Sequence, residues 1–136
     1  FIRPLAPNSI EEEYIIDGIE EEIFEPIHLK FKELSVENVV WSKEQNLAFF
    51  DIDKLVFPLK LRKWREGDKI KPFGMSGTKK VSDLLIDHKI PLHLKAHTWV
   101  LESNDEIVWV IGLRSSQKHK VDSNSVRVCT VELLDA

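Results

Sequence analysis

The sequence predicts a small, strand-rich α+β domain with mostly antiparallel strands and one main helix, at about residues 79–88. Short apolar runs separated by polar or glycine-containing turns recur along the 136 residues, a pattern typical of strands. One segment only repeats apolar side chains at helical spacing. The single cysteine excludes a disulfide-stapled scaffold and fits a reducing compartment.

Alternating apolar and charged side chains predict half-buried strands around Leu29 and Leu61. Other apolar runs complete the set. The predicted strands cover residues 27–32, 36–41, 47–50, 59–64, 98–101, 107–111 and 126–134. Tryptophans in these patterns are predicted to lie in the core: Trp41, Trp99 and Trp109. Cys129 has apolar neighbours in the last strand, which predicts a small buried residue.

The helix prediction rests on a face with i, i+3, i+4, i+7 spacing, formed by Val81, Leu84, Leu85 and His88. Thr78 is placed to cap this helix, and Ile90-Pro91 to end it. Turns are predicted at residues 42–46, 66–68 and 103–105, and a loop with two glycines at residues 72–77.

The N-terminal residues carry the weakest structural pattern. Residues 1–9 contain two prolines and predict a linker or an extended lead-in. Residues 11–25 hold clustered glutamates around short apolar runs, which predict an acidic hairpin or a weak helix at a solvated edge. Because the first residue is Phe1 and not Met, we expect the chain to be part of a longer protein. No apolar run is long enough to span a bilayer, so no membrane association is expected.

Charge is distributed unevenly along the chain, whose formal net charge is −4. The net charge is −8 over residues 1–59, +6 over residues 60–120 and −2 over residues 121–136. The acidic total excludes a nucleic-acid coat that is basic throughout. The basic central segment fits either a face that binds a polyanion or a solvated surface of mixed charge. Composition leaves both interpretations open.

The glycine-containing loop before the helix does not match a Walker phosphate loop. Two residues, and not four, separate Gly74 from Gly77, and Lys79-Lys80 follow Thr78. A weaker hypothesis remains, in which backbone N–H groups around Gly77–Lys80 open a helix that attracts an anion. The alternative is an ordinary capped helix with solvated lysines.

Metal and catalytic sites are disfavoured. His93 and His97 have the spacing of a zinc-binding helical pair, but no glutamate follows His93 and Pro91 leaves only a short turn. A metal hydrolase that uses these residues with His88 is therefore the least favoured function. Asp83 and Asp87 share a helix face and are interpreted as solvated or structural. No nucleophile elbow is present, and we predict neither catalytic residues nor a metal site.

The remaining candidate is recognition of RNA or DNA phosphates by the basic segment. The predicted RNA-binding residues are Arg62, Lys63, Arg65, Lys71, Lys79, Lys80, Lys89, Arg114 and Lys118, with Lys69 and Lys120 in a wider set. Trp64 lies between two of these cations, where it fits either stacking on an exposed base or, more favourably, a place in the core.

Several motifs occur in order in this segment. Residues 62–75 read R-x-W-x-x-G-D-x-x-x-P-x-G-M, residues 79–87 read K-K-x-x-D-x-x-I-D, and Ile90-Pro91 follows. Asp51–Leu55 reads D-x-D-K-L, and Trp109–Arg114 contains W-V-x-G-x-R. Over residues 47–134 the chain closely resembles the C-terminal domain of the tRNA(Ile)-lysidine synthetase (TilS) family. It departs from the family pattern at residues 115–119.

The resemblance implies a variable lead-in over residues 1–46, partly linker and strands, and a tRNA-binding domain over residues 47–136. It implies a cytoplasmic bacterial ligase that uses ATP with magnesium to join lysine to the wobble cytidine of an isoleucine tRNA. The ATP-binding S-G-G-x-D-S loop of that family is absent here, so this chain is expected to be non-catalytic and to hold no cofactor. Its expected partners are the tRNA acceptor stem and the N-terminal catalytic domain, with a homodimer of the full enzyme left open.

A different function class is a structural or protein-interaction domain that docks within the enzyme without touching RNA. In that case the acidic residues 11–25 dock on another part of the chain and the lysines are solvated. The combinations Arg62…Asp68 and Lys80…Asp83 would then be internal salt bridges, which contribute little to stability when exposed.

Overall fold

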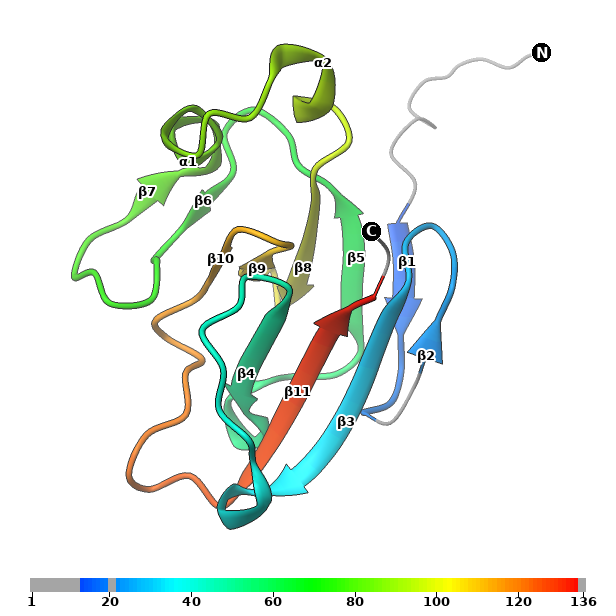
Figure 1. Cartoon of the computed structure of the whole chain (residues 1–136), viewed down its shortest axis with the longest axis vertical. Helices are drawn as coiled ribbons and strands as arrows, with labels where there is room; N and C mark the ends of the chain where they lie inside the picture. Colours follow the sequence, from blue (N-terminus) through cyan, green and yellow to red (C-terminus); the bar gives the residue numbers. More distant parts are fainter. Residues whose placement is uncertain (1–12, 20–21, 135–136) are drawn as a thin grey trace.

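Two antiparallel sheets form most of the structure, a computed structural model that describes residues 13–19 and 22–134 (Figure 1). The first sheet has the order β1-β5-β8-β9-β10, over Glu13–Ile16, Leu59–Lys63, Trp99–Ser103, Glu106–Val110 and Arg114–Ser115. The second has the order β2-β3-β11-β4, over Glu22–Ile23, Leu29–Ser35, Arg127–Leu133 and Leu47–Asp51.

A smaller unit, which we call the lobe, lies between β5 and β8 and comprises residues 64–98. It contains the hairpin β6-β7 and the helices α1 and α2, at Lys69–Ile70, Lys79–Lys80, Val81–Asp87 and Leu92–Lys95. Short 3₁₀ turns elsewhere cover Val36–Asn38 and Ile52–Lys54. In Figure 1 the lobe is the green and yellow-green part at the upper left, apart from the second sheet.

The main core lies between the two sheets. Leu59 and Leu61 of β5 and Trp109 of β9 pack with Phe31 of β3 and Phe50 of β4, all of them buried. Period-two alternation sends these side chains to the same face of each strand. The sheets therefore form a sandwich whose inner faces exclude water.

The opposite face of the first sheet is covered as well. Val100 of β8 and Val110 of β9 pack against Val81 and Leu85 of α1 and against Ile70 of β6. The first sheet is thus a middle layer between the second sheet and the lobe. This explains the uninterrupted apolar run at residues 107–111, because a strand covered on both faces needs apolar side chains at every position.

The predicted α+β class, with mostly antiparallel strands and one main helix, is confirmed. The predicted hairpin is also present, but Ser103 is the last residue of β8, and the loop is Asn104-Asp105, with φ values of 51° and 66°. Positive φ at two adjacent turn positions is what a tight two-residue hairpin requires. Cys129 is fully buried, as predicted, and burial raises the pKa of its thiol to about 12, with a further contribution from the charge of Glu33.

The strand predicted at residues 36–41 is wrong. The chain leaves β3 after Ser35, forms the 3₁₀ turn Val36–Asn38 and then continues without a ladder to β4. The N–H of Val36 still donates to the carbonyl oxygen of Val126, one residue beyond the last pair of the β3–β11 ladder, and the 3₁₀ turn then takes the backbone out of the sheet. The core prediction for Trp41 is also wrong, since this side chain is 53% exposed.

The other predicted tryptophans lie in the core region. Trp109 is buried, and Trp99 is half-buried against the main core. Thr78, however, does not cap the main helix. Helix α1 begins two residues later than predicted, with Lys80 at the N-cap and no side-chain capping bond, because Lys79 and Lys80 pair with β6 in a short ladder.

Some predictions on the N-terminal residues lie outside the described residues, namely the lead-in at residues 1–9 and the glutamates at positions 11, 12, 20 and 21. The described part of the acidic segment forms β1 and β2, which pair with β5 and β3. Strand β3, before residue 47, lies in one sheet with β4 and β11, so the second sheet draws on both sides of the predicted domain boundary. None of the helices in the described ranges has the length and apolar character needed to cross a membrane.

We expect Phe50→Ala to lower the free energy of unfolding by about 3–5 kcal/mol, since it removes a fully buried ring from the sandwich core. Phe24 is 63% exposed beside β2, and Phe24→Ala is the matched control, with an expected loss below about 1 kcal/mol. Urea unfolding followed by circular dichroism measures both. Similar losses for the two variants would contradict the position of the core.

Candidate functional site

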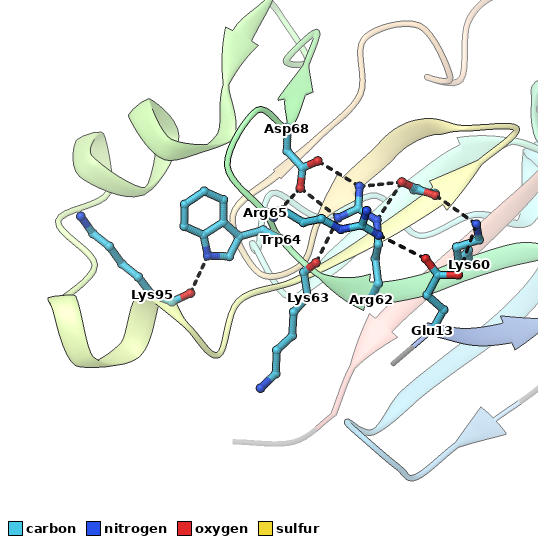
Figure 2. Close-up of polar contacts among 9 residues, drawn as sticks. Glu13, Lys60, Arg62, Lys63, Trp64, Arg65, Asp68 and Lys95 are labelled. Carbon is cyan, nitrogen blue, oxygen red and sulfur yellow. Dashed lines mark hydrogen bonds and ion pairs between the residues drawn. The ribbon is translucent and has the colours of Figure 1, made fainter. Parts of the chain in front are cut away.

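Arg62 lies at the centre of a buried ion-pair cluster where the lobe meets the first sheet (Figure 2). Its Nε and Nη2 donate to Glu102 Oε2 over 2.8 and 2.6 Å. Its Nη1 and Nη2 donate to Asp68 Oδ2 and Oδ1 over 2.9 and 3.0 Å. A further bond of 3.0 Å joins Nη1 to the carbonyl oxygen of Lys63. All three guanidinium nitrogens are therefore engaged within the protein.

The position of Arg62 follows from strand alternation. Leu59 and Leu61 face the sandwich core, so Arg62 faces the side of the first sheet that the lobe covers. Burial alone lowers the pKa of the guanidinium, but the hydrogen bonds and charges of Asp68 and Glu102 outweigh it and raise the pKa above its ordinary value. Arg62 is 5% exposed. We therefore leave Arg62 out of the proposed RNA contacts, because its donors already bind partners within the protein.

Asp68 connects this cluster to the rest of the lobe. Its carboxylate also accepts the N–H of Arg65 over 2.7 Å, and its backbone carbonyl accepts the N–H of Val81 at the start of α1 over 2.9 Å. The predicted internal pair Arg62…Asp68 is thus formed. The predicted pair Lys80…Asp83 is not among the ion pairs of the described residues, and Lys79 pairs with Asp87 instead.

The hypothesis of an anion site around Gly77–Lys80 loses its physical basis in this arrangement. Lys79 and Lys80 are extended in β7, and the first N–H of α1, that of Val81, already donates to Asp68. Helix α1 has only seven residues, so the field at its N-terminus is weak.

Trp64 is a structural residue of the lobe. Its indole Nε1 donates to the backbone carbonyl of Lys95 over 2.7 Å, and its ring packs against the apolar cluster under α1 (Figure 2). This agrees with the core interpretation of Trp64 and not with stacking on an exposed base. Lys63, which precedes Trp64, points away from the ion-pair cluster in Figure 2. Its Nζ lies 5.6 Å from the centroid of a Trp99 ring.

Three other predicted cations are paired with surface carboxylates. Arg65 Nη2 lies 3.1 Å from Glu13, and Lys118 Nζ lies 2.6 Å from Glu106. Lys79 pairs with Asp87. Arg114 is half-buried at β10, and its Nη2 donates to the carbonyl oxygen of Phe73 over 3.2 Å. These residues hold surface segments together, in contacts that a phosphate would have to replace.

A second group of cations on the lobe lacks such pairing. Lys69, Lys71, Lys80 and Lys89 are all exposed. Among the described residues, no carboxylate lies within ion-pair distance of Lys69, Lys80 or Lys89. In the β6-β7 ladder Lys69 is directly opposite Lys80, and opposite residues of an antiparallel pair point to the same side. The register brings Lys69 into the site, although the predicted nine-residue set omits it.

The segment where the sequence departs from the family pattern contains a buried polar cluster that the sequence did not predict. Ser116 Oγ lies 2.9 Å from His119 Nδ1, and both side chains are buried. Glu106 Oε1 lies 3.7 Å from His119 Nε2. Ser116 Oγ also accepts the N–H of Lys118 over 3.1 Å. These contacts tie Ser116, Lys118 and His119 together in a local turn.

Metal ligation finds no support in the geometry. In the ranges 13–19 and 22–134, no three His, Cys, Asp or Glu side chains come together as a metal site. His93 lies within the short helix α2 and His97 follows it, both of them exposed, and His88 is the C-cap residue of α1.

Comparison with known protein families gives a match over more than half of the chain. Residues 59–132 match the family model described as the TilS substrate C-terminal domain. The chain belongs to this family. The match runs from β5 to β11 and so includes Arg62, Asp68, Glu102 and the lysines of the lobe.

Curated relatives and a solved structure extend the comparison. The chain is 45% identical over 111 residues to the tRNA(Ile)-lysidine synthase of Parabacteroides distasonis. The aligned residues make up 81% of this chain and 25% of that protein. The chain is 39% identical over 92 residues to the enzyme of Bacteroides thetaiotaomicron, covering 68% of this chain and 22% of that protein. The chain thus spans about a quarter of these relatives. A crystal structure of a TilS C-terminal domain shares the fold, with a TM-score of 0.75, 21% identity, and coverage of 92% of this chain and all of that one.

In this TilS C-terminal domain, Arg62→Ala is expected to lower the free energy of unfolding by about 3–5 kcal/mol, because it removes the buried guanidinium that pairs with the half-buried carboxylates of Asp68 and Glu102. Lys118→Ala removes an exposed pair and is the control, with an expected loss below about 1 kcal/mol. Chemical unfolding measures both losses. An Arg62→Ala variant as stable as Lys118→Ala would contradict a structural role for Arg62.

Stability should also fall at mildly acidic pH because of His119. Burial lowers the pKa of His119 below its ordinary value of 6.5, and the charges of Lys118 and Lys54 lower it further against the opposing charge of Glu106. The unfolded chain therefore binds the proton more readily, so His119 costs no stability well above pH 6.5, and stability is lost as the pH falls from there through the lower folded pKa.

The free energy of unfolding is measured for the parent and for His119→Asn between about pH 8 and pH 5, an interval that spans the usual titration range of histidine. His119→Asn should show a smaller loss across this range than the parent. His97→Asn, at an exposed position, should behave like the parent. Equal pH dependence in all three proteins would exclude His119 as the cause.

Proposed function

We propose that this chain is a tRNA-recognition domain of a tRNA(Ile)-lysidine synthase and binds the acceptor stem through the lysines of the lobe. Family membership and the names of its curated relatives support the enzyme assignment. The proposed contact residues are Lys69, Lys71, Lys80 and Lys89 of the lobe and the adjoining Lys63 of β5, with Arg65, Lys79, Arg114 and Lys118 as residues that would exchange an internal partner for a phosphate.

One observation carries the proposal. Lys69 and Lys80 are directly opposite in the β6-β7 ladder, both are exposed, and neither forms an ion pair with a described residue. Like charges at opposite positions of a ladder destabilise it. A polyanion on this side would relieve that repulsion, so the arrangement costs stability in the free protein and gains affinity in the complex.

Double-stranded RNA suits such a surface. Its sequence is hard to read from the deep major groove, so proteins bind it through phosphates, 2′-hydroxyl groups and shape. Phosphate contacts fix position and orientation without reading bases. A lysine-bearing hairpin held rigidly on a sheet supplies point charges at fixed spacing, which is sufficient for this purpose.

Lysidine formation belongs to the full enzyme in this proposal. ATP, magnesium and lysine would bind to the N-terminal catalytic domain of the same cytoplasmic enzyme. The residues of this chain do not fit the nucleotide: the S-G-G-x-D-S loop is missing from the sequence, and no cluster of metal ligands exists among the described residues. Its own task is to bind and select the tRNA; a homodimer of the full enzyme is compatible with this task.

The Lys69→Ala/Lys80→Ala double variant tests the lysine surface. With about four phosphate contacts in the parent, the logarithm of the association constant should fall with the logarithm of salt concentration at a slope of roughly −3 to −4. Loss of two contacts should reduce the slope by about 2 and weaken binding at low salt. Fluorescence anisotropy with a blunt acceptor-stem minihelix of the isoleucine tRNA measures both quantities.

Lys30→Ala/Lys32→Ala is the matched control, because these lysines are exposed on β3 of the second sheet, outside the lobe. It should bind as the parent does. If the lobe variant keeps the parental affinity and slope, these lysines are not in the site. If the parent binds no RNA even at low salt, the structural or protein-interaction function is favoured.

A further inference from the structure

A cavity of about 610 Å³ opens beside the lobe, at the end of the first sheet. Its walls come from the segment before β4, from β4 itself, from the β6–β7 loop and from the residues around β10. The volume lies in the range of sites that hold small molecules or single groups of a larger ligand. Of the predicted RNA-binding residues, Arg114 lines it, together with Lys120 of the wider set.

Aromatic rings dominate the lining. Trp41 is 53% exposed and Phe73 is 51% exposed, although each is large and apolar. The Trp41 ring packs on Phe49, with ring centroids 4.9 Å apart, and Phe49, Trp109 and Leu113 complete the apolar part of the wall. Two aromatic side chains thus remain half-uncovered at one cavity, where burial would ordinarily be favoured.

The cavity also has a positive rim. Lys43, Arg114 and Lys120 line it, with Glu44 as the acidic residue of the lining. Lys120 Nζ lies 5.8 Å from the centroid of the Phe73 ring, and Arg114 Nη2 donates to the Phe73 carbonyl over 3.2 Å. Cations therefore lie beside an exposed aromatic ring. The cavity is suited to a ligand that joins an anionic group to a planar ring.

Phe73 is held in place by its backbone. Its N–H donates to the carbonyl oxygen of Ser115 over 2.9 Å, and the N–H of Gly74 donates to Gln117 Oε1 over 2.7 Å. Pro72 forms a bridge with Ser116. The loop backbone that carries the ring is therefore ordered before a ligand arrives, which lowers the entropic cost of binding.

We propose that this cavity binds one unpaired nucleobase of an RNA, stacked on Trp41 or Phe73, with the adjoining phosphate on Arg114 or Lys120. The inference rests on the proposed RNA-binding function and adds a single-stranded element to it. Proteins hold unpaired bases by stacking on aromatic side chains beside a positively charged path for the backbone. The β6–β7 loop that carries Phe73 also joins the two strands that carry Lys69 and Lys80. The same hairpin therefore contributes to the lysine surface and to the cavity.

Charge favours this occupant over a segment of another protein domain. An apolar peptide would cover Trp41 and Phe73 but has no use for three cations at the rim, whereas a nucleotide uses both parts of the lining. A phosphate at Arg114 would form a charge-assisted contact of the kind that guanidinium groups favour.

The test compares two RNA hairpins with the same stem, one blunt and one with a four-nucleotide single-stranded 3′ end, of a length on the order of one stacking site. Binding of the blunt hairpin reports the proposed duplex function alone. The tailed hairpin should bind about tenfold more tightly to the parent, which corresponds to stacking of one base. Trp41→Ala or Phe73→Ala should abolish this preference, and neither should change the affinity for the blunt hairpin.

Phe73→Ala is the second variant, because its ring is exposed while its backbone contacts remain. Phe24→Ala is the control, because its ring is exposed beside β2, whereas the cavity lies beside β4 at the other edge of the second sheet. This variant should keep the preference of about tenfold. Circular dichroism and thermal unfolding verify the fold of each variant.

Equal affinity of the parent for the blunt and tailed hairpins overturns this inference and leaves the duplex function standing. A tail preference that survives in both Trp41→Ala and Phe73→Ala overturns it as well, because the tail then binds elsewhere. Failure of both hairpins to bind at low salt overturns the proposed function, and this inference with it.

Discussion

The guanidinium of Arg62 joins the lobe to the central sheet, and the placement of the basic residues depends on that junction. Arg62 reaches Glu102 on the neighbouring strand and Asp68 in the lobe, while Asp68 in turn receives the first N–H of α1. A buried charge of this kind is costly unless each donor has a partner. The geometry satisfies that condition only when strand, turn and helix keep their relative positions, so one cluster fixes three elements.

A lobe held in this way can carry charges that a flexible hairpin could not position. Lys69 and Lys80 are kept opposite one another by the β6-β7 ladder despite their repulsion, and the apolar contacts of Ile70 and Leu85 with the sheet supply the compensating stability. The aromatic cavity beside the same loop has the complementary chemistry. In the proposed function, duplex phosphates and an unpaired base would have separate binding sites on one rigid support.

Much of the fold was predictable because local patterns suffice for it. Helical spacing at Val81 and Leu85 and the apolar run at residues 107–111 each indicate their element without knowledge of neighbours. The strand predicted at residues 36–41 failed for the opposite reason. An apolar run with a terminal tryptophan reads as a strand, but no neighbouring strand pairs with it, and Trp41 remains on the surface beside Phe49.

The sequence by itself determined the fold class, the main helix and, through ordered motifs, the family. It also determined that the positive charge lies in residues 60–120. Only the tertiary structure decided which cations face solvent. Arg62 and Lys80 are both basic residues next to an apolar residue in the sequence. Arg62 is nevertheless buried under the lobe, whereas Lys80 is exposed. The physical reason is that alternation along a strand assigns a side chain to a face, whereas packing by distant residues decides whether that face is covered.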